Sequence, residues 1–143
     1  MWTRATVPQW AVDLVNEVCT ARRRRPAHIR SWMVKNNRPW STGFCRDDDR
    51  SICIVQGFDE VNARTVLVHE LAHYLTPVNH DHDKLFWRRC WELHLAYSDL
   101  ADAWRCESTY MKKAITYAPP SVLARFAGPI GPEATSDASS VAL

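Results

Sequence analysis

One motif in the sequence can do chemistry, the pattern His-Glu-x-x-His at residues 69–73. It lies in the stretch 60–75, whose pattern is typical of a helix, and histidines four positions apart share one face of a helix. Both imidazoles can therefore bind a single Zn²⁺ at about 2.0–2.1 Å. Glu70 lies beside them, where a carboxylate can take a proton from a water activated by the metal. The motif predicts His69 and His73 as zinc ligands and Glu70 as general base.

The setting of the motif favours function over coincidence. Apolar residues occupy many of the other positions nearby: Val66, Leu67, Val68, Leu71, Ala72 and Leu75. A carboxylate and two imidazoles in such a helix cost free energy when they are buried without partners. A bound metal ion would supply the partner.

A catalytic zinc site needs a third protein ligand and a position left open for water. Five groups downstream of the motif are within reach: His80, Asp81, His82, Asp83 and Glu92. The metzincin pattern is excluded, because Thr76 and Asn79 stand where it has its glycine and its third histidine. A pattern of the thermolysin type would instead take its third ligand, here Glu92, from a later helix.

Chain geometry favours His82 among these candidates. Pro77 ends the motif helix, so the chain must reverse before the next helix begins near residue 83. A residue at that helix start is held by the reversal, whereas His80 lies within the loop and Glu92 lies further along the helix. We expect His82 as the third ligand, with His80 and Glu92 as the alternatives.

The segment His82-Asp83-Lys84-Leu85-Phe86-Trp87 also carries a family resemblance. Over residues 50–95 the chain resembles the SprT-like zinc metallopeptidases and short related proteins of actinobacteria and their phages. Those proteins pair a His-Glu-x-x-His helix with a His-Gly-x-x-Phe or His-Gly-x-x-Trp segment. The resemblance implies His69, His73 and His82 as zinc ligands and Glu70 as general base, with Phe86 packed behind the site.

The sequence departs from that family at two points. Asp83 stands where the family usually has glycine, and the C-terminal zinc-binding cysteines of some members are missing. The second departure removes any inference about a nucleic-acid role that depends on a zinc ribbon. For the oxyanion that forms during hydrolysis, Tyr74, Tyr97 and His80 are the candidate hydrogen-bond donors.

The remaining pattern predicts an α+β, zincin-like single domain over residues 1–120. We expect helices at 7–23, 60–75, 83–97 and 98–117. Extended segments at 29–35, 40–46 and 51–55 predict a small, mainly antiparallel sheet. Small and helix-breaking residues predict a mobile C-terminal tail over residues 121–143.

Cysteine content and hydropathy predict a cytoplasmic protein. The 143 residues contain no apolar run long enough to cross a membrane and no apolar signal-peptide core at the N-terminus. Five cysteines at irregular spacings, without a Cys-x-x-Cys pair, indicate reduced thiols. A Cys45–Cys53 disulfide across a hairpin is the one alternative.

Charge is distributed unevenly and raises one alternative partner. Residues 21–50 hold nine of the eighteen Lys and Arg residues, including the run Arg22, Arg23, Arg24 and Arg25. Such a run can contact nucleic-acid phosphate, although four cations at a helix C-terminus also suit the helix dipole.

The sequence therefore predicts a zinc-dependent peptidase acting on protein or peptide substrates. Two alternatives remain, a non-catalytic zinc-stabilised binding or regulatory module and a nucleic-acid-associated accessory protein. The presence of Glu70, which a structural zinc site does not need, favours the enzyme.

Overall fold

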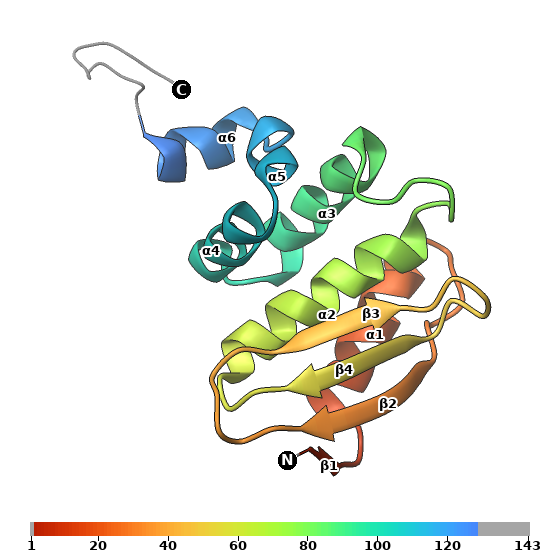
Figure 1. The fold of residues 1–143 in the computed structure, drawn as a ribbon. Coiled ribbons are helices and arrows are strands. Elements are labelled where there is room, and N and C mark those ends of the chain that lie inside the picture. Colours follow the sequence, from red (N-terminus) through yellow and green to blue (C-terminus); the bar gives the residue numbers. More distant parts are fainter. Residues whose placement is uncertain (1, 129–143) are drawn as a thin grey trace.

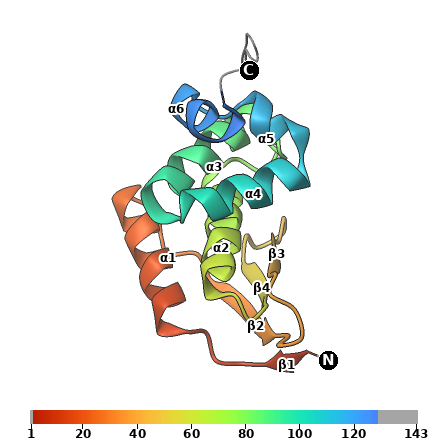
Figure 2. The ribbon, with the colours of Figure 1, turned by 90° about the vertical axis from the view of Figure 1, so that its left-hand side faces the viewer.

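The computed structural model describes residues 2–128 and places helices on one face of a small sheet. Helix α1 (Gln9–Ala21) and helix α2 (Glu60–Leu75) cover that face, and the later helices gather on the far side of α2 (Figures 1 and 2). The predicted α+β class is confirmed. Within the described residues, no helix is long and apolar enough to cross a membrane.

The sheet has four strands in the order β1-β2-β4-β3. They are β1 (Thr3–Arg4), β2 (Ile29–Val34), β3 (Thr42–Cys45) and β4 (Ile52–Gln56). β1 pairs with β2, and β3 with β4, in antiparallel fashion, but β2 and β4 are parallel, so the sheet is mixed. The two-residue strand β1 was not predicted, because two residues are too few to show a period of two. β3 forms one edge of the sheet, and that edge borders the site described below.

The central position of β4 explains its apolar sequence. Ile52 and Ile54 are fully buried, and Cys53 is nearly so. In the ladder, Cys45 lies opposite Ile52 while Cys53 lies opposite Phe44. Successive side chains of a strand point to opposite faces, so Cys45 and Cys53 face apart. The alternative disulfide is wrong, and all five cysteines are free thiols.

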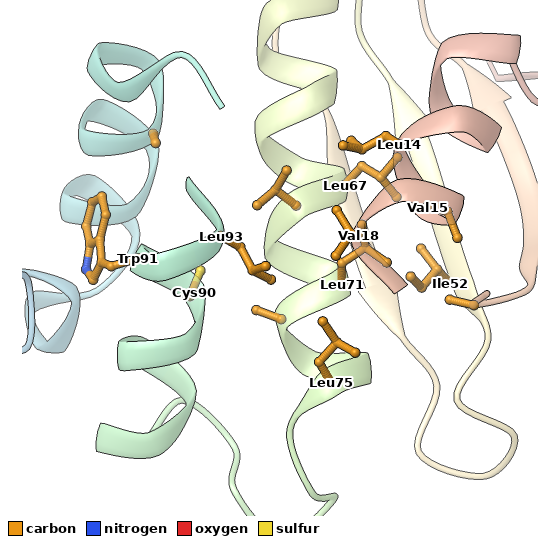
Figure 3. Packing of buried hydrophobic residues seen from close by; sticks show 14 of the residues in the cluster. Leu14, Val15, Val18, Ile52, Leu67, Leu71, Leu75, Cys90, Trp91 and Leu93 are labelled. Carbon is orange, nitrogen blue, oxygen red and sulfur yellow. The ribbon is translucent and has the colours of Figure 1, made fainter. Parts of the chain in front are cut away.

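Helix α2 is the centre of the hydrophobic core (Figure 3). Leu67 and Leu71 are fully buried between α1, which contributes Val18, and helix α3 (Lys84–Tyr97), which contributes Leu93. Because α2 is covered on several sides, its position is set by packing along most of its length. A metal site built on its surface therefore rests on a rigid element.

The predicted helix over 98–117 is two helices. α4 (Leu100–Tyr110) and α5 (Lys112–Thr116) are separated by Met111, whose backbone is extended. The cap of α4 is Asp99, whose side chain accepts from the Asp102 N–H. No proline or glycine marks the break. The turn allows the α5 carbonyl of Ala114 to accept a hydrogen bond from the Trp91 indole of α3.

The packed part of the chain continues beyond residue 120, where the sequence placed the start of the tail. Residues 120–122 form α6 (Pro120–Val122), and a π-helical turn, η1 (Leu123–Ala127), follows it. Val122 is fully buried, and the Phe126 ring stacks on Trp104 at 5.8 Å. Residues 129–143, the rest of the predicted tail, lie outside the described residues.

Candidate metal centre

One side chain at each end holds helix α2 in place. The side chain of Asp59 caps the helix N-terminus by accepting from the N–H groups of Val61 and Asn62. At the other end, the Arg50 guanidinium donates to the carbonyls of His73 and Thr76. Carbonyls at a helix C-terminus have no partners within the helix, so Arg50 fixes the turn that carries His73.

The structure brings three histidine nitrogens together. The Nε2 atom of His82 lies 3.3 Å from Nε2 of His69 and 3.1 Å from Nε2 of His73. Two nitrogens bound tetrahedrally to zinc at about 2.0–2.1 Å lie about 3.3–3.4 Å apart. The two distances from His82 therefore fit one zinc ion, and all three ligand atoms lie within 4.8 Å of one another.

Carboxylates close to the other ring nitrogens strengthen this fit. Nδ1 of His69 lies 2.7 Å from the Glu107 carboxylate, and Nδ1 of His82 lies 2.8 Å from Asp81. A neutral imidazole that donates from Nδ1 carries a lone pair at Nε2. In this tautomer the Nε2 lone pair of His69 faces Nε2 of His82, where a bound cation would take the place of a proton on His69.

Asp83 caps helix α3 at the position where the SprT-like metallopeptidases usually have glycine. Its carboxylate caps α3 by accepting from the Phe86 N–H at 3.0 Å and also contacts Nδ1 of His80 at 2.6 Å. His82, just before it, has a φ of 50°, which is uncommon for a residue with a Cβ atom. The capped helix start holds His82 in this conformation, so Asp83 supports the ligand position.

Glu107 is the functional residue that the sequence did not assign. One of its carboxylate oxygens lies 2.7 Å from His69 Nδ1, 2.7 Å from His94 Nε2 and 3.3 Å from the Cys90 thiol. His94 in turn contacts Ser98 at 2.7 Å. The sequence signal was a lone carboxylate among the core-facing positions of the helix predicted over 98–117. A carboxylate behind a metal-binding histidine fixes the tautomer and the orientation of the ring.

Electrostatics around the three histidines follow from this arrangement. Burial lowers the pKa of His69, but the Glu107 carboxylate outweighs burial and raises it to about 9. Burial and the neighbouring charge of His69 lower the pKa of His73 to about 3, and the same two causes lower the pKa of His82. Burial opposes ionisation of Glu107, yet His69 and His94 hold its pKa well below the usual range. Glu107 therefore carries a negative charge that favours a cation in front of His69.

Glu70 lies beside the histidines against strand β3. A Cβ atom built on Gly43 would meet the Glu70 Cγ at 3.2 Å, so the glycine makes room for this side chain. Burial, reinforced by Glu107, raises the pKa of Glu70 to about 7, against the opposing effect of His69. A carboxyl group in that range can accept and return a proton near neutral pH.

The three histidines and Glu70 open into one cavity of about 690 Å³. Its walls come from the edge strand β3, the loop after α2 and the C-terminal half of α4, including Trp40, Phe44, Val78, Arg105 and Tyr110. Burial and the nearby charge of Glu70 raise the pKa of Tyr110, which keeps its phenol protonated. A cavity of this size, bordered by a free strand edge, can take an extended peptide segment.

The other residues considered from sequence lie away from the three nitrogens. Glu92 is exposed and pairs with Arg22 at 2.8 Å, and the Arg24 guanidinium lies over the Tyr74 ring at 5.2 Å. Two cations of the basic run therefore already have partners within the chain. His80 lines the cavity, but its Nδ1 is engaged by Asp83.

Comparisons of the chain with protein-family models, with curated proteins and with solved structures found no match.

Proposed function

We propose that the protein is a zinc-dependent peptidase that hydrolyses peptide bonds, with His69, His73 and His82 as the metal ligands. The observation that carries the proposal is the convergence of three imidazole Nε2 atoms beside a buried carboxylate, Glu70, in one open cavity. The resemblance of the motif segments to SprT-like metallopeptidases points to the same chemistry.

Glu70 and Glu107 have different roles in the proposed hydrolysis. When bound, zinc would act as a Lewis acid that lowers the pKa of water and polarises a carbonyl. Glu70 accepts the proton of the attacking water and passes it to the leaving amine. Glu107 holds the His69 ring so that its Nε2 lone pair faces the site.

The edge strand β3 supports a peptide as the substrate. In the antiparallel ladder, the Arg46 N–H donates to the Ser51 carbonyl of the neighbouring chain segment. Backbone groups of every second residue point the same way, so those of Phe44 and Thr42 point toward β4. The backbone groups of Gly43 and Cys45 then face the outer edge of the sheet, where the Cys45 backbone also hydrogen-bonds to the Glu70 carboxylate. An extended substrate can pair with this edge and bring a carbonyl to the metal.

A metal-dependent cleavage assay tests the proposal. Zinc-loaded protein should degrade fluorescein-labelled casein, and a strong chelator should stop it. Glu70→Gln should keep zinc and the fold but lose at least about 10²-fold in rate, because an amide cannot accept the proton.

The outcome also separates the enzyme from a zinc-stabilised binding module. If Glu70→Gln cleaved casein as fast as the wild type, Glu70 would not be the base. If the zinc-loaded wild type left casein intact, the peptidase assignment itself would fail.

We propose that the protein acts in the cytoplasm, because all five cysteines are free thiols.

A further inference from the structure

Hydrolysis of an amide needs a hydrogen-bond donor for the negative charge that develops on the carbonyl oxygen. We propose that the hydroxyl of Tyr110 is this donor. The inference rests on the proposed peptidase function and adds a catalytic residue to it.

Tyr110 is placed beside the metal ligands by the end of α4. It is the last residue of that helix, and the extended backbone of Met111 ends the helix directly after it. Its ring lies edge-on to both His69 and His82, at 5.9 Å and 5.5 Å between ring centroids. Tyr110 therefore stands over two of the three groups that would hold the metal.

The side chain is also open to substrate. Tyr110 is 58% exposed and lines the same cavity as Glu70. A carbonyl brought to the histidine nitrogens lies next to this ring, on the α4 wall, whereas Glu70 approaches from the β3 side of the cavity. Glu70 would then activate the attacking water from one wall of the cavity, and Tyr110 would stabilise the charge on the carbonyl oxygen from another.

The tyrosines favoured by the sequence are placed elsewhere. Tyr74 donates its hydroxyl to the Arg25 carbonyl at 2.7 Å, beneath the Arg24 side chain. Tyr97 lies at the end of α3 and is absent from the cavity wall. Neither phenol reaches the three histidines.

The cationic groups around the cavity are engaged in other contacts. Arg50 donates to the carbonyls of His73 and Thr76. Arg105 pairs with Asp102 and lies over the Trp40 ring at 4.2 Å. His80, whose Nδ1 contacts Asp83, is the remaining rival donor, and the experiment includes it.

The experiment compares Tyr110→Phe with the matched control Tyr74→Phe, which removes the same hydroxyl away from the site. A quenched peptide spanning a casein bond that the wild type cleaves supplies kcat and KM. Chelator competition supplies zinc affinity, and calorimetry supplies the affinity of a phosphinic peptide that mimics the tetrahedral intermediate. Tyr110 is exposed, and Tyr74→Phe removes a single solvent-exposed hydrogen bond, so both variants should fold like the wild type.

For Tyr110→Phe we expect kcat to fall about 10²–10³-fold, as for loss of one oxyanion donor. The phosphinic peptide should lose affinity in parallel, while KM and zinc affinity stay within about three-fold of the wild type, because only charge in the transition state is affected. Tyr74→Phe should match the wild type in every measurement.

Three results from the variants would overturn the assignment of Tyr110 while leaving the peptidase function in place. One is a Tyr110→Phe variant with wild-type kcat, and another is a variant whose zinc affinity falls as much as its rate. The third is a His80→Asn variant that carries the loss instead. A zinc-loaded wild type that cleaves nothing would overturn the peptidase function and the role of Tyr110 with it. The cleavage assay of the wild type is therefore done before any variant is made.

Discussion

The Glu107 carboxylate fixes the orientation of His69, although the two residues are 38 positions apart. The same oxygen contacts His94, so it is held from two sides in a pocket that leaves Glu107 only 3% exposed. Loss of one such contact leaves a buried polar group without a partner, which costs about 1–3 kcal/mol. Glu107, which is not one of the three proposed ligands, is thus central to the position of His69.

Glu107→Gln should weaken zinc binding by about 10–100-fold, as for other losses of a carboxylate behind a metal-binding histidine. The same oxygen contacts both rings, so the amide oxygen can still accept from them, but without the negative charge it holds the His69 ring less firmly. Competition with a fluorescent zinc chelator measures the effect. Glu92→Gln makes the same chemical change on exposed α3 surface and should leave the affinity unchanged. Equal affinities in the two variants would show that Glu107 does not support the site.

Among the elements, α2 and β3 form one wall of the cavity together. α2 presents Glu70, and β3 leaves space for it through Gly43, where a Cβ atom would also come within 2.8 Å of Ile54 and 3.0 Å of the Cys53 carbonyl. The helix and the strand edge therefore sit closer together at this point than any larger side chain allows. Substrate pairing with β3 depends on the same close approach.

Gly43→Ala should lower the free energy of unfolding by about 1–3 kcal/mol, the usual cost of overpacking. It should also slow casein cleavage, because Glu70 must shift away from the new methyl group, while the three histidines keep zinc. Urea unfolding and the cleavage assay check both effects. Thr42→Ala, a neighbouring exposed position of the strand, is the control. A Gly43→Ala variant with full stability and full rate would contradict the close packing of α2 and β3.

The sequence predicts the elements whose signals are local and misses the contacts made between elements. α2 carries its cap at Asp59 and its end before Pro77 within the segment itself, and its predicted bounds match the structure. The parallel pairing of β2 with β4 depends on the order of the strands in the sheet, and the sequence of a single strand does not specify that order. Glu107 likewise meets His69 only through the packing of α4, and the break at Met111 follows from packing of α5 on α3.

Across the whole molecule, the C-terminal helices close the core on the side of α3 and α4. Val122 is fully buried, and Phe126 stacks on Trp104 with an angle of 14° between the rings. These contacts support α4, which carries both Glu107 and Tyr110. The packed unit that holds the site therefore includes residues 120–127.

A chain that ends at Pro119 should lose at least about 2 kcal/mol of unfolding free energy, because it leaves the apolar surface under Val122 and Phe126 exposed to water. A chain that ends at Gly128 keeps these contacts and should match the full-length protein. Urea unfolding of the two chains makes the comparison. Equal stability would mean that α6 and η1 contribute nothing to the packed unit.

Zinc content, measured by mass spectrometry after zinc loading and dialysis, tests the central claim most directly. The wild type should hold about one zinc per chain, since three imidazoles and a water complete a tetrahedral site. His82→Ala should hold less than about a tenth of that, because two ligands remain, whereas His80→Ala and Glu92→Gln should match the wild type. A wild type without zinc, or a His82→Ala variant that retains about one zinc per chain, would contradict the three-histidine centre.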